Sequence, residues 1–577
     1  MALLLGVSTM KGVPAHPLPV KVQQPDGTYV TLRLVGDEWC HFQTTLDGYS
    51  IIKDTRGYYV YAEKRDDQLH PTAQVAHDEA ERSVSERAFL ADVRKYQAPE
   101  MTEQAKAMYQ MVQQHPQATW ASHRSQGRRA TNYTDFKGLI ILIEFNDKSF
   151  SRDDYKEILT DMVNKENYEG YDLDASDPQM FTGSVRDYFS DNSDGKFQPQ
   201  FDIVGPYKVD YSQYDCNVYT GKCAEILRAA IDSADVVGGV DFKDYDGDGD
   251  GFVDLVFYMI AGMGANYNGN DENLWWPHRG AMWARKDDVS FWDYVSSVEL
   301  LGWQSKPASI KMDGIGTICH EFSHVLGLPD FYDTDYEKSG GESNHPGVWS
   351  LMSYGCYEND ARTPVGYSLF ERYSVHFCDV PEKITEEGRY TLEPLYSSFT
   401  GYRIDSPVDD EFFLFEFRQK NDFKWDEYLP GSGMLVHRVE KPGMNFWNGN
   451  NKLNVNPAHN YYEVVRADGA HKDKDGKYVS TNADVFPGSK NVRSLDVFTS
   501  PAHLKSWSGE QTELGLKNIT MQDGVITFDV EKVVDTGIRT VTSDDKAVAP
   551  LYNLHGQRVD TTHRGLVIRK GRAVLNK

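Results

Sequence analysis

Short runs of alternating apolar and polar residues mark the first part of the chain. Such runs, separated by turn-forming residues, extend from residue 16 to about residue 95. Two examples are Tyr29–Leu34 and Tyr58–Tyr61. Alternation places apolar side chains on one face of a strand, so a small β-rich module is predicted. From 96 to 130 the composition shifts to Gln, Ala, Arg and Ser. That shift predicts a polar helix followed by an exposed, cleavable linker.

The middle of the chain mixes strand and helix patterns. The apolar runs Gly138–Phe145 and Val253–Ile260 predict buried strands, and Lys196–Val204 is also strand-like. Ser184–Phe189 has the pattern of a short helix. Strands and helices in alternation predict an α/β or α+β domain over 131–380.

From 381 to 535 the pattern changes to β alone. Phe412–Phe417, Gly433–His437 and Gly524–Val530 predict strands, and the regular turns between such runs favour a β sandwich. The remaining residues, 536–577, form a short tail with two strand-like runs, Leu566–Ile568 and Ala573–Leu575.

A helix predicted to begin at Asp313 carries the chemistry. Asp313 is a good N-cap, and apolar residues follow at helical spacing: Ile315, Ile318, Phe322 and Val325. His320 and His324 are four residues apart, which places both imidazoles on one face of this helix. Glu321 stands beside the first histidine, where it can act on a water without binding the metal.

Gly327 falls where this helix must stop, because glycine tolerates the left-handed backbone of a helix end. The reversal can return Asp330 to the ion that His320 and His324 bind. Three protein ligands and one open position are typical of a catalytic zinc. Glu337 or Glu342 is the alternative third ligand, as in a thermolysin-like zinc protease, but Gly327 and Asp330 argue against it.

The segment Trp349–Tyr354 has the form of a Met-turn, the methionine loop found beneath the metal of metzincin proteases. Met352 is the methionine of this turn. Tyr354 follows two residues later, where some metzincins place a tyrosine that moves to the metal or to the oxyanion. Tyr354 is therefore a candidate catalytic residue beside Glu321.

A second metal site is predicted in the loop that precedes the strand at Val253–Ile260. Carboxylates recur at alternate positions with glycines between them, an arrangement that can curl around a hard cation. An EF-hand is excluded because Phe257 stands where its bidentate glutamate belongs. The predicted calcium-binding residues are Asp246, Asp248, Asp250, Phe252 and Asp254.

Length and charge limit the remaining possibilities. A chain of 577 residues predicts several domains, and its net charge of −27 argues against nucleic acid as a partner. Outside the N-terminus no apolar stretch reaches membrane-spanning length. The oligomeric state stays open.

The cysteines are too few for a disulfide scaffold, since there are 6 in the chain. Cys216 and Cys223 are close enough in sequence for a local bridge. Cys319 adjoins the histidines but points away from them, so a packed core position is expected.

The chain begins with a short apolar stretch followed by Val13-Pro14-Ala15, which is similar to a signal core with a small-residue cleavage site, although the usual positive start is missing. Residues 1–15 are therefore interpreted as a signal remnant. Export to the outside of the cell or to its surface is expected.

Taken together, these motifs resemble the immune inhibitor A-like secreted metalloproteases, a metzincin-like group. The resemblance covers roughly residues 20–535. It rests on the zinc motif ending in Asp330, the calcium loop, Ser350–Tyr354, Gly183–Phe189 and the β segments Phe415–Lys420 and Leu429–His437. It implies a pro-segment at 16–130, a zinc protease domain at 131–380 and protein or peptide substrates. The tail at 536–577 resembles C-terminal segments of exported bacterial proteins, which suggests a sorting segment.

The expected function is a secreted zinc endopeptidase made as a latent zymogen, with Glu321 as the base. Gly36-Asp37 and Cys40 are candidate groups for blocking the zinc. A non-enzymatic surface or adhesion protein with a decayed protease domain is the rival from a different class. The intact Glu321 argues against decay.

Overall fold

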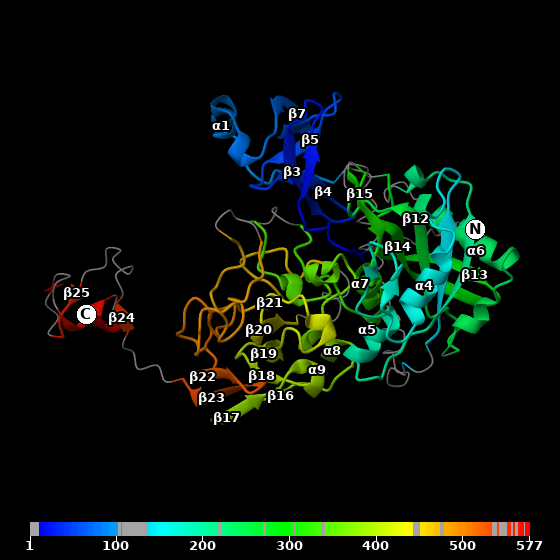
Figure 1. The fold of residues 1–577 in the computed structure, drawn as a ribbon. Helices are drawn as coiled ribbons and strands as arrows, with labels where there is room; N and C mark the ends of the chain where they lie inside the picture. Colours follow the sequence, from blue (N-terminus) through cyan, green and yellow to red (C-terminus); the bar gives the residue numbers. More distant parts are fainter. Residues whose placement is uncertain are drawn as a thin grey trace, which may run out of the picture.

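The computed structural model describes residues 11–577 except for these: 102–105, 107–132, 134–135, 217–221, 248, 269–272, 305, 336–340, 442–450, 474–477, 534–538, 542–550, 555–557, 560–563, 570–571 and 577. Figure 1 shows a blue N-terminal β module above a cyan and green α/β domain, with a yellow and orange β region beside it and the red C-terminal segment apart. The predicted multidomain chain with β-rich parts and α/β content is confirmed. The polar helix and linker expected at 96–130 lie largely outside the described residues.

The N-terminal module is one antiparallel meander in which each strand pairs with the next. In β3 the residues alternate between buried and half-buried, so Val30, Leu32 and Leu34 enter the core. The elements are β2 (Val20–Gln23), β3 (Tyr29–Gly36), β4 (His41–Thr45), β5 (Ser50–Lys53), β6 (Tyr59–Arg65), β7 (Gln68–Val75) and α1 (Val84–Leu90).

The central domain is built on a 7-stranded mixed sheet with the order β1-β13-β14-β12-β8-β11, in which β15 also pairs with β14. β8, β11, β12 and β14 run parallel, and the β13 edge is antiparallel. The strands are β1 (Lys11–Gly12), β8 (Gly138–Glu144), β11 (Phe201–Lys208), β12 (Val256–Met263), β13 (His278–Lys286), β14 (Val289–Trp303) and β15 (Lys306–Met312). A small hairpin joins β9 (Gly170–Tyr171) and β10 (Gln179–Met180).

Helices cover both faces of this sheet, as Figure 1 shows. Along β8, Leu139 and Ile141 pack with α6 in one core, whereas Ile140 and Leu142 pack with α4, α5 and α7 in the other. The period of two in a strand explains this division. The helices are α4 (Tyr155–Asn164), α5 (Val185–Asn192), α6 (Lys222–Val236), α7 (Ile315–Leu326) and α8 (Leu369–Ser374).

The C-terminal region contains a 5-stranded and a 3-stranded sheet that share one hydrophobic core. The first has β16 (Glu382–Lys383), β18 (Tyr402–Asp405), β19 (Glu411–Arg418), β20 (Gly433–Glu440) and β21 (Tyr462–Val464); the second has β17 (Gly388–Leu392), β22 (Leu514–Gln522) and β23 (Val525–Lys532). The short helix α9 spans Leu395–Ser398. The tail has its own sheet of β24 (Arg539–Val541), β25 (Leu551–Tyr552), β26 (Arg558–Val559), β27 (Gly565–Arg569) and β28 (Arg572–Asn576).

Three details differ from expectation or bear on it. The helix α7 begins at Ile315 with Gly314 as its N-cap, not at Asp313. A Cβ on Gly314 would lie 2.2 Å from the Ala361 carbonyl oxygen, so this N-cap position has no room for a side chain. Cys216 and Cys223 are both free thiols, and Cys319 is fully buried as expected.

In the described part of the chain, no helix is long and apolar enough to cross a bilayer.

Candidate metal centre

The zinc motif lies on α7, which is buried along its whole length. Ile318, Phe322 and Val325 hold this helix against the sheet core. At its end Gly327 adopts a φ of 112°, and its N–H donates to the His324 carbonyl. The Leu328 N–H donates to Ser323, which completes a Schellman motif. The expected reversal of the chain at Gly327 is therefore present.

The reversal brings His320, His324 and Asp330 together, with one ligand atom of each within 4.8 Å of the others. The His320 Nε2 lies 3.1 Å from the Asp330 Oδ1, and the His324 Nε2 lies 3.4 Å from the same oxygen. All three side chains are buried. Within the described residues, no other group of histidine, cysteine and acidic side chains meets this distance test.

Hydrogen bonds on the far side of each ring fix the tautomers. The His320 Nδ1 lies 2.9 Å from the Leu351 carbonyl oxygen, and the His324 Nδ1 lies 2.7 Å from that of Leu328. Each Nδ1 must therefore carry the proton, which leaves both Nε2 atoms as lone-pair donors. Two such nitrogens and a carboxylate oxygen converge on one point, and only a cation satisfies all three. The residues present therefore fit a metal ion.

The electrostatics of Asp330 agree with this arrangement. Burial acts to raise the pKa of Asp330, and positive charge at the point where the two rings meet this carboxylate acts to lower it. Burial lowers the pKa of His324 to about 4, so this ring is neutral and able to bind a metal. The Asn451 amide donates to the Asp330 Oδ2 over 2.6 Å and holds the carboxylate from the side opposite the histidines.

Glu321 is also fully buried. Burial raises its pKa well above the ordinary value, and the nearby Asp330 and Glu38 carboxylates raise it further. Its Oε1 accepts a hydrogen bond of 2.7 Å from the backbone N–H of Val13. The N-terminal segment therefore lies directly on the candidate base.

The Met-turn lies beside the histidines. The Leu351 carbonyl holds His320, and the Met352 carbonyl accepts from the Phe331 N–H over 2.8 Å. Met352 itself is fully buried in the core that contains α7. This turn thus connects the helix with the segment that follows Asp330.

Tyr354 begins the short 3-10 turn η7 (Tyr354–Tyr357), and its hydroxyl points to Glu342 over 3.4 Å. It is not one of the groups gathered around Asp330. Glu342 in turn lies 3.7 Å from the His345 Nε2, away from His320 and His324. Glu337, the other alternative ligand, lies outside the described residues.

The carboxylates of the predicted calcium loop bind the loop's own backbone. Asp246 accepts from the N–H groups of Asp250 and Gly251, and the Phe252 N–H donates to Asp250 over 2.9 Å. Asp254 is buried and accepts from Gly247. Asp248 lies outside the described residues, and calcium binding here stays a prediction.

Several residues at the centre carried no sequence signal of their own. The Tyr332 hydroxyl donates to the Gly12 carbonyl over 2.7 Å, and the Tyr357 hydroxyl donates to that of Pro14 over 2.6 Å. Asn451 reaches Asp330 across 121 positions in sequence. Residues so distant in sequence produce no spacing pattern, so only the tertiary structure reveals them.

The candidate blocking groups of the N-terminal module are placed as follows. The Asp37 carboxylate accepts from the N–H groups of Trp39 and Cys40, and the Cys40 thiol donates to the Pro99 carbonyl. Glu38, between them, is buried; burial raises its pKa, and so do the Asp37 and Asp330 carboxylates, while Glu38 in turn raises the pKa of Glu321. Sequence reasoning singled out its neighbours and not Glu38.

The part of the chain that contains this centre is similar to known metallopeptidases. Residues 124–373 match the model of the immune inhibitor A peptidase M6 catalytic domain. The chain is 26% identical to immune inhibitor A of Bacillus thuringiensis subsp. alesti, over 40% of this chain and 38% of that protein. It is 25% identical to an Arthroderma benhamiae protein named as a secreted metallopeptidase, over 30% of this chain and 29% of that protein.

The pre-pro-metalloprotease PrtV of Vibrio cholerae is also 25% identical, over 38% of this chain and 27% of that protein. The matched segments thus span about two fifths or less of these relatives. The expected resemblance to immune inhibitor A-like metallopeptidases is confirmed. That family implies a metal at the centre, which agrees with the three converging ligands.

Proposed function

We propose that this chain is a secreted, zinc-dependent endopeptidase that is made as a latent zymogen. The convergence of the His320 and His324 Nε2 atoms on the Asp330 Oδ1 carries the proposal, with Glu321 beside them. When bound, zinc supplies Lewis-acid activation of a water and of the scissile carbonyl. The names of the relatives support secretion and peptidase activity.

In this proposal Glu321 takes a proton from the attacking water and passes it to the leaving amine. Its raised pKa suits that role, because a carboxyl with too low a pKa would hold the proton too weakly to deliver it. The backbone N–H of Val13 lies where the leaving amine of a substrate would stand, 2.7 Å from the Glu321 Oε1. His320, His324 and Asp330 hold the metal, and Met352 supports them from the core.

Latency is supported by the path of residues 11–14. β1 pairs antiparallel with the edge strand β13, as an added substrate strand would. The Tyr332 hydroxyl donates to the Gly12 carbonyl, and the Trp276 indole N–H donates to the Val13 carbonyl over 2.9 Å. Glu38 packs beside Gly12. A substrate could not reach Glu321 while this segment is bound. This role requires that residues 11–15 stay on the chain after export, where they would act together with the pro-segment.

The finer structural assignments belong to the same proposal. We assign 16–130 to the pro-segment, 131–380 to a metzincin-like protease domain, 381–535 to a β sandwich and 536–577 to a sorting tail. The loop with Asp246, Asp250, Phe252 and Asp254 would hold a structural calcium ion. Tyr354 would need to leave Glu342 before it could assist the oxyanion.

The proposal is tested with Glu321→Gln. The variant should retain about one zinc per chain, because Glu321 is not a ligand, while casein hydrolysis falls by at least about 100-fold. Asp330→Asn is the matched variant and should lose zinc as well as activity. If Glu321→Gln hydrolyses casein at the normal rate, its role as base is wrong. A wild-type protein with zinc but no hydrolysis of any protein would favour the non-enzymatic alternative.

Latency is tested by cleaving the purified chain within 125–129. Hydrolysis should rise once the N-terminal part has separated. Equal rates before and after cleavage would contradict an inhibitory pro-segment.

A further inference from the structure

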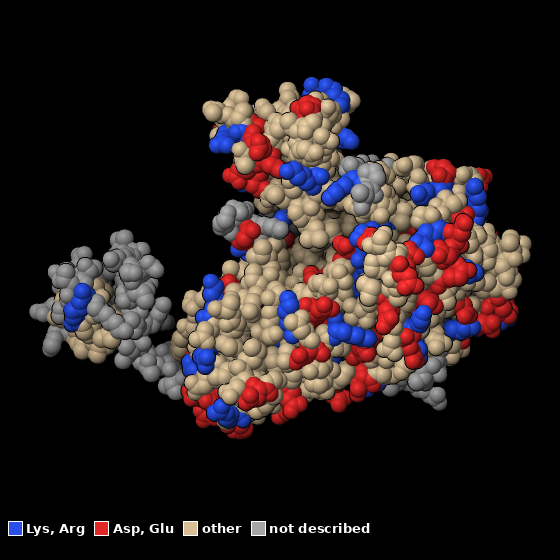
Figure 2. Space-filling model, in the orientation of Figure 1, with Lys and Arg blue, Asp and Glu red and all other residues tan. Residues whose placement is uncertain are grey.

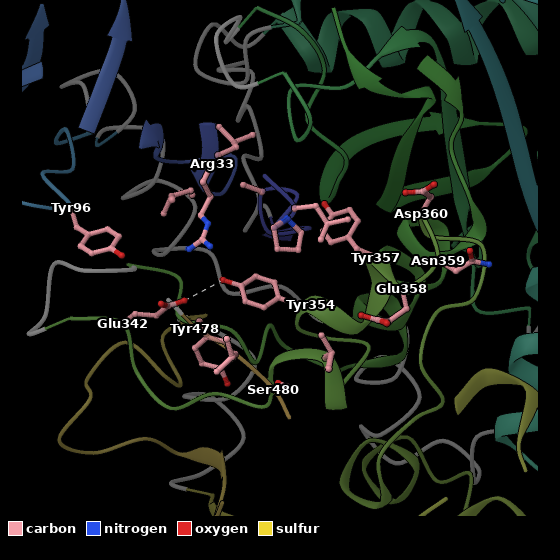
Figure 3. Close-up of a pocket in the computed structure, with 18 residues that line it drawn as sticks. Arg33, Tyr96, Glu342, Tyr354, Tyr357, Glu358, Asn359, Asp360, Tyr478 and Ser480 are labelled. Atoms are coloured by element: carbon pink, nitrogen blue, oxygen red, sulfur yellow. Dashed lines mark hydrogen bonds between the residues drawn. The ribbon is translucent and has the colours of Figure 1, made fainter. Parts of the chain in front are cut away.

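A cavity of about 480 Å³ lies where the N-terminal module, the central domain and the C-terminal β region meet. Figure 2 shows the surface hollowed below the N-terminal module, and Figure 3 shows the residues that line the cavity. The N-terminal part contributes Arg33 and the segment from Ala15 to Leu18. Leu34, Val35, Gly36 and Tyr96 also come from the N-terminal part, and the other lining residues, Tyr354 among them, belong to the proposed enzyme.

The enzyme wall of this cavity is acidic. It contains Glu342, Glu358 and Asp360, and all three are labelled in Figure 3. Burial acts to raise the pKa of Glu342, yet His345 and nearby cations including Arg33 hold it below the ordinary value. Burial raises the pKa of Glu358 to about 7. Glu358 is therefore only partly ionised near neutral pH, and a cation bound beside it would favour its ionised form.

Arg33 is the only basic side chain among the lining residues that the structure describes. It extends from β3 into the cavity toward Tyr354 and Glu342 (Figure 3). Its Nε and Nη2 atoms are buried and, within the described residues, make no hydrogen bond. A guanidinium in a protein usually donates several hydrogen bonds. Arg33 therefore lies in the cavity with donor groups that are not used.

The cavity also has a defined position relative to Glu321. If Val13 is counted as the first residue after the cleaved bond, Ala15 is the third, and Pro17 and Leu18 are the fifth and sixth. These residues line the cavity. Between Glu321 and the cavity, the Tyr357 hydroxyl donates a hydrogen bond to the Pro14 carbonyl. One continuous segment therefore connects Glu321 with the cavity.

From this arrangement we propose that the cavity is a specificity subsite. It selects an arginine or lysine side chain three to six residues after the cleaved bond, and Arg33 occupies it in the latent chain. The inference rests on the proposed peptidase function. Glu358 and Asp360 supply the charge, and Tyr354 and Tyr478 supply aromatic walls against which a guanidinium can pack.

The test uses the folded chain after cleavage within 125–129 and removal of the N-terminal part. Internally quenched peptides carry Arg or norleucine at each position from the third to the sixth. Wild-type enzyme should show a kcat/KM about tenfold higher for Arg at one of these positions. Glu358→Gln and Asp360→Asn should each reduce that ratio to about 2, because kcat/KM falls more for the Arg peptide than for the norleucine peptide.

Asp409→Asn, which alters an exposed carboxylate outside the cavity lining, is the matched control and should retain the full ratio. Binding of the same peptides to Glu321→Gln enzyme, followed by fluorescence anisotropy, gives a readout that needs no turnover. Equal kcat/KM and equal affinity for Arg and norleucine peptides would overturn the subsite while leaving the peptidase intact. No cleavage of any peptide by wild-type enzyme would instead refute the peptidase function and the subsite with it.

Discussion

Asp313, just before α7, predicts a pH-dependent stability of the folded chain. It is buried, and burial raises its pKa from 3.8 to about 7. Between these two pH values the folded state holds a proton that the unfolded state has lost, so folding stability falls as pH rises through this window. Each pKa unit corresponds to about 1.4 kcal/mol, which gives an upper bound of about 4 kcal/mol for the loss.

The perturbation is Asp313→Asn, which imitates the protonated carboxyl. The Asp313 Oδ1 accepts from the Gly314 N–H over 2.8 Å, and an amide oxygen can keep this bond. The variant should therefore be stabilised relative to wild type more strongly at pH 8 than at pH 5. By the usual scaling, a difference of a few kcal/mol corresponds to several degrees in Tm for a domain of this size.

The assay is thermal unfolding at both pH values, followed by tryptophan fluorescence, with metal removed so that zinc binding does not contribute. Asp153→Asn, at an exposed position, is the control and should show no such difference. If the Tm difference between Asp313→Asn and wild type is the same at pH 5 and pH 8, the reasoning from burial is wrong.

Three further predictions concern backbone and metal. Gly327→Ala must adopt a φ of 112° and should cost about 1–2 kcal/mol, lowering zinc occupancy, measured by metal analysis at limiting zinc; unchanged stability would contradict it. Gly316→Ala places a Cβ 1.9 Å from the Cys356 carbonyl oxygen and should lower Tm by more than Gly239→Ala, where the space is open although the φ is 64°. Removal of calcium should lower Tm in wild type but not in Asp254→Asn; equal losses in both would argue against the calcium loop.

The sequence predicted those parts of the centre that local geometry determines. His320 and His324 are four residues apart, and helix geometry alone places them on one face. Gly327 adopts the predicted left-handed conformation because a helix end requires it. The buried strand β8 was predicted almost to its ends, since a run of apolar residues covered on both faces is a strong signal.

Other features depended on packing that no local pattern encodes. The long hairpin of β13 and β14 was not predicted, since its register shifts near Ala281 and its residues do not alternate simply. The N-cap of α7 was misplaced by one residue, since the structure places Gly314 there, where the Ala361 carbonyl leaves no room for a side chain. The contact between Val13 and Glu321 joins residues 308 positions apart, and sequence spacing carries no information at that distance.

The N-terminal part contacts the proposed enzyme at two places that serve different purposes. Val13 covers Glu321, which in our proposal blocks chemistry, and Arg33 enters the acidic cavity, which in our proposal blocks recognition. Val13 lies just before the N-terminal module and Arg33 lies in its strand β3, so departure of the N-terminal part opens both places together. Arg33→Met should then weaken binding of the N-terminal part without changing the contact at Glu321. A full chain with this substitution should become active sooner after cleavage within 125–129, yet remain inactive before it, because Val13 alone still prevents access to the base.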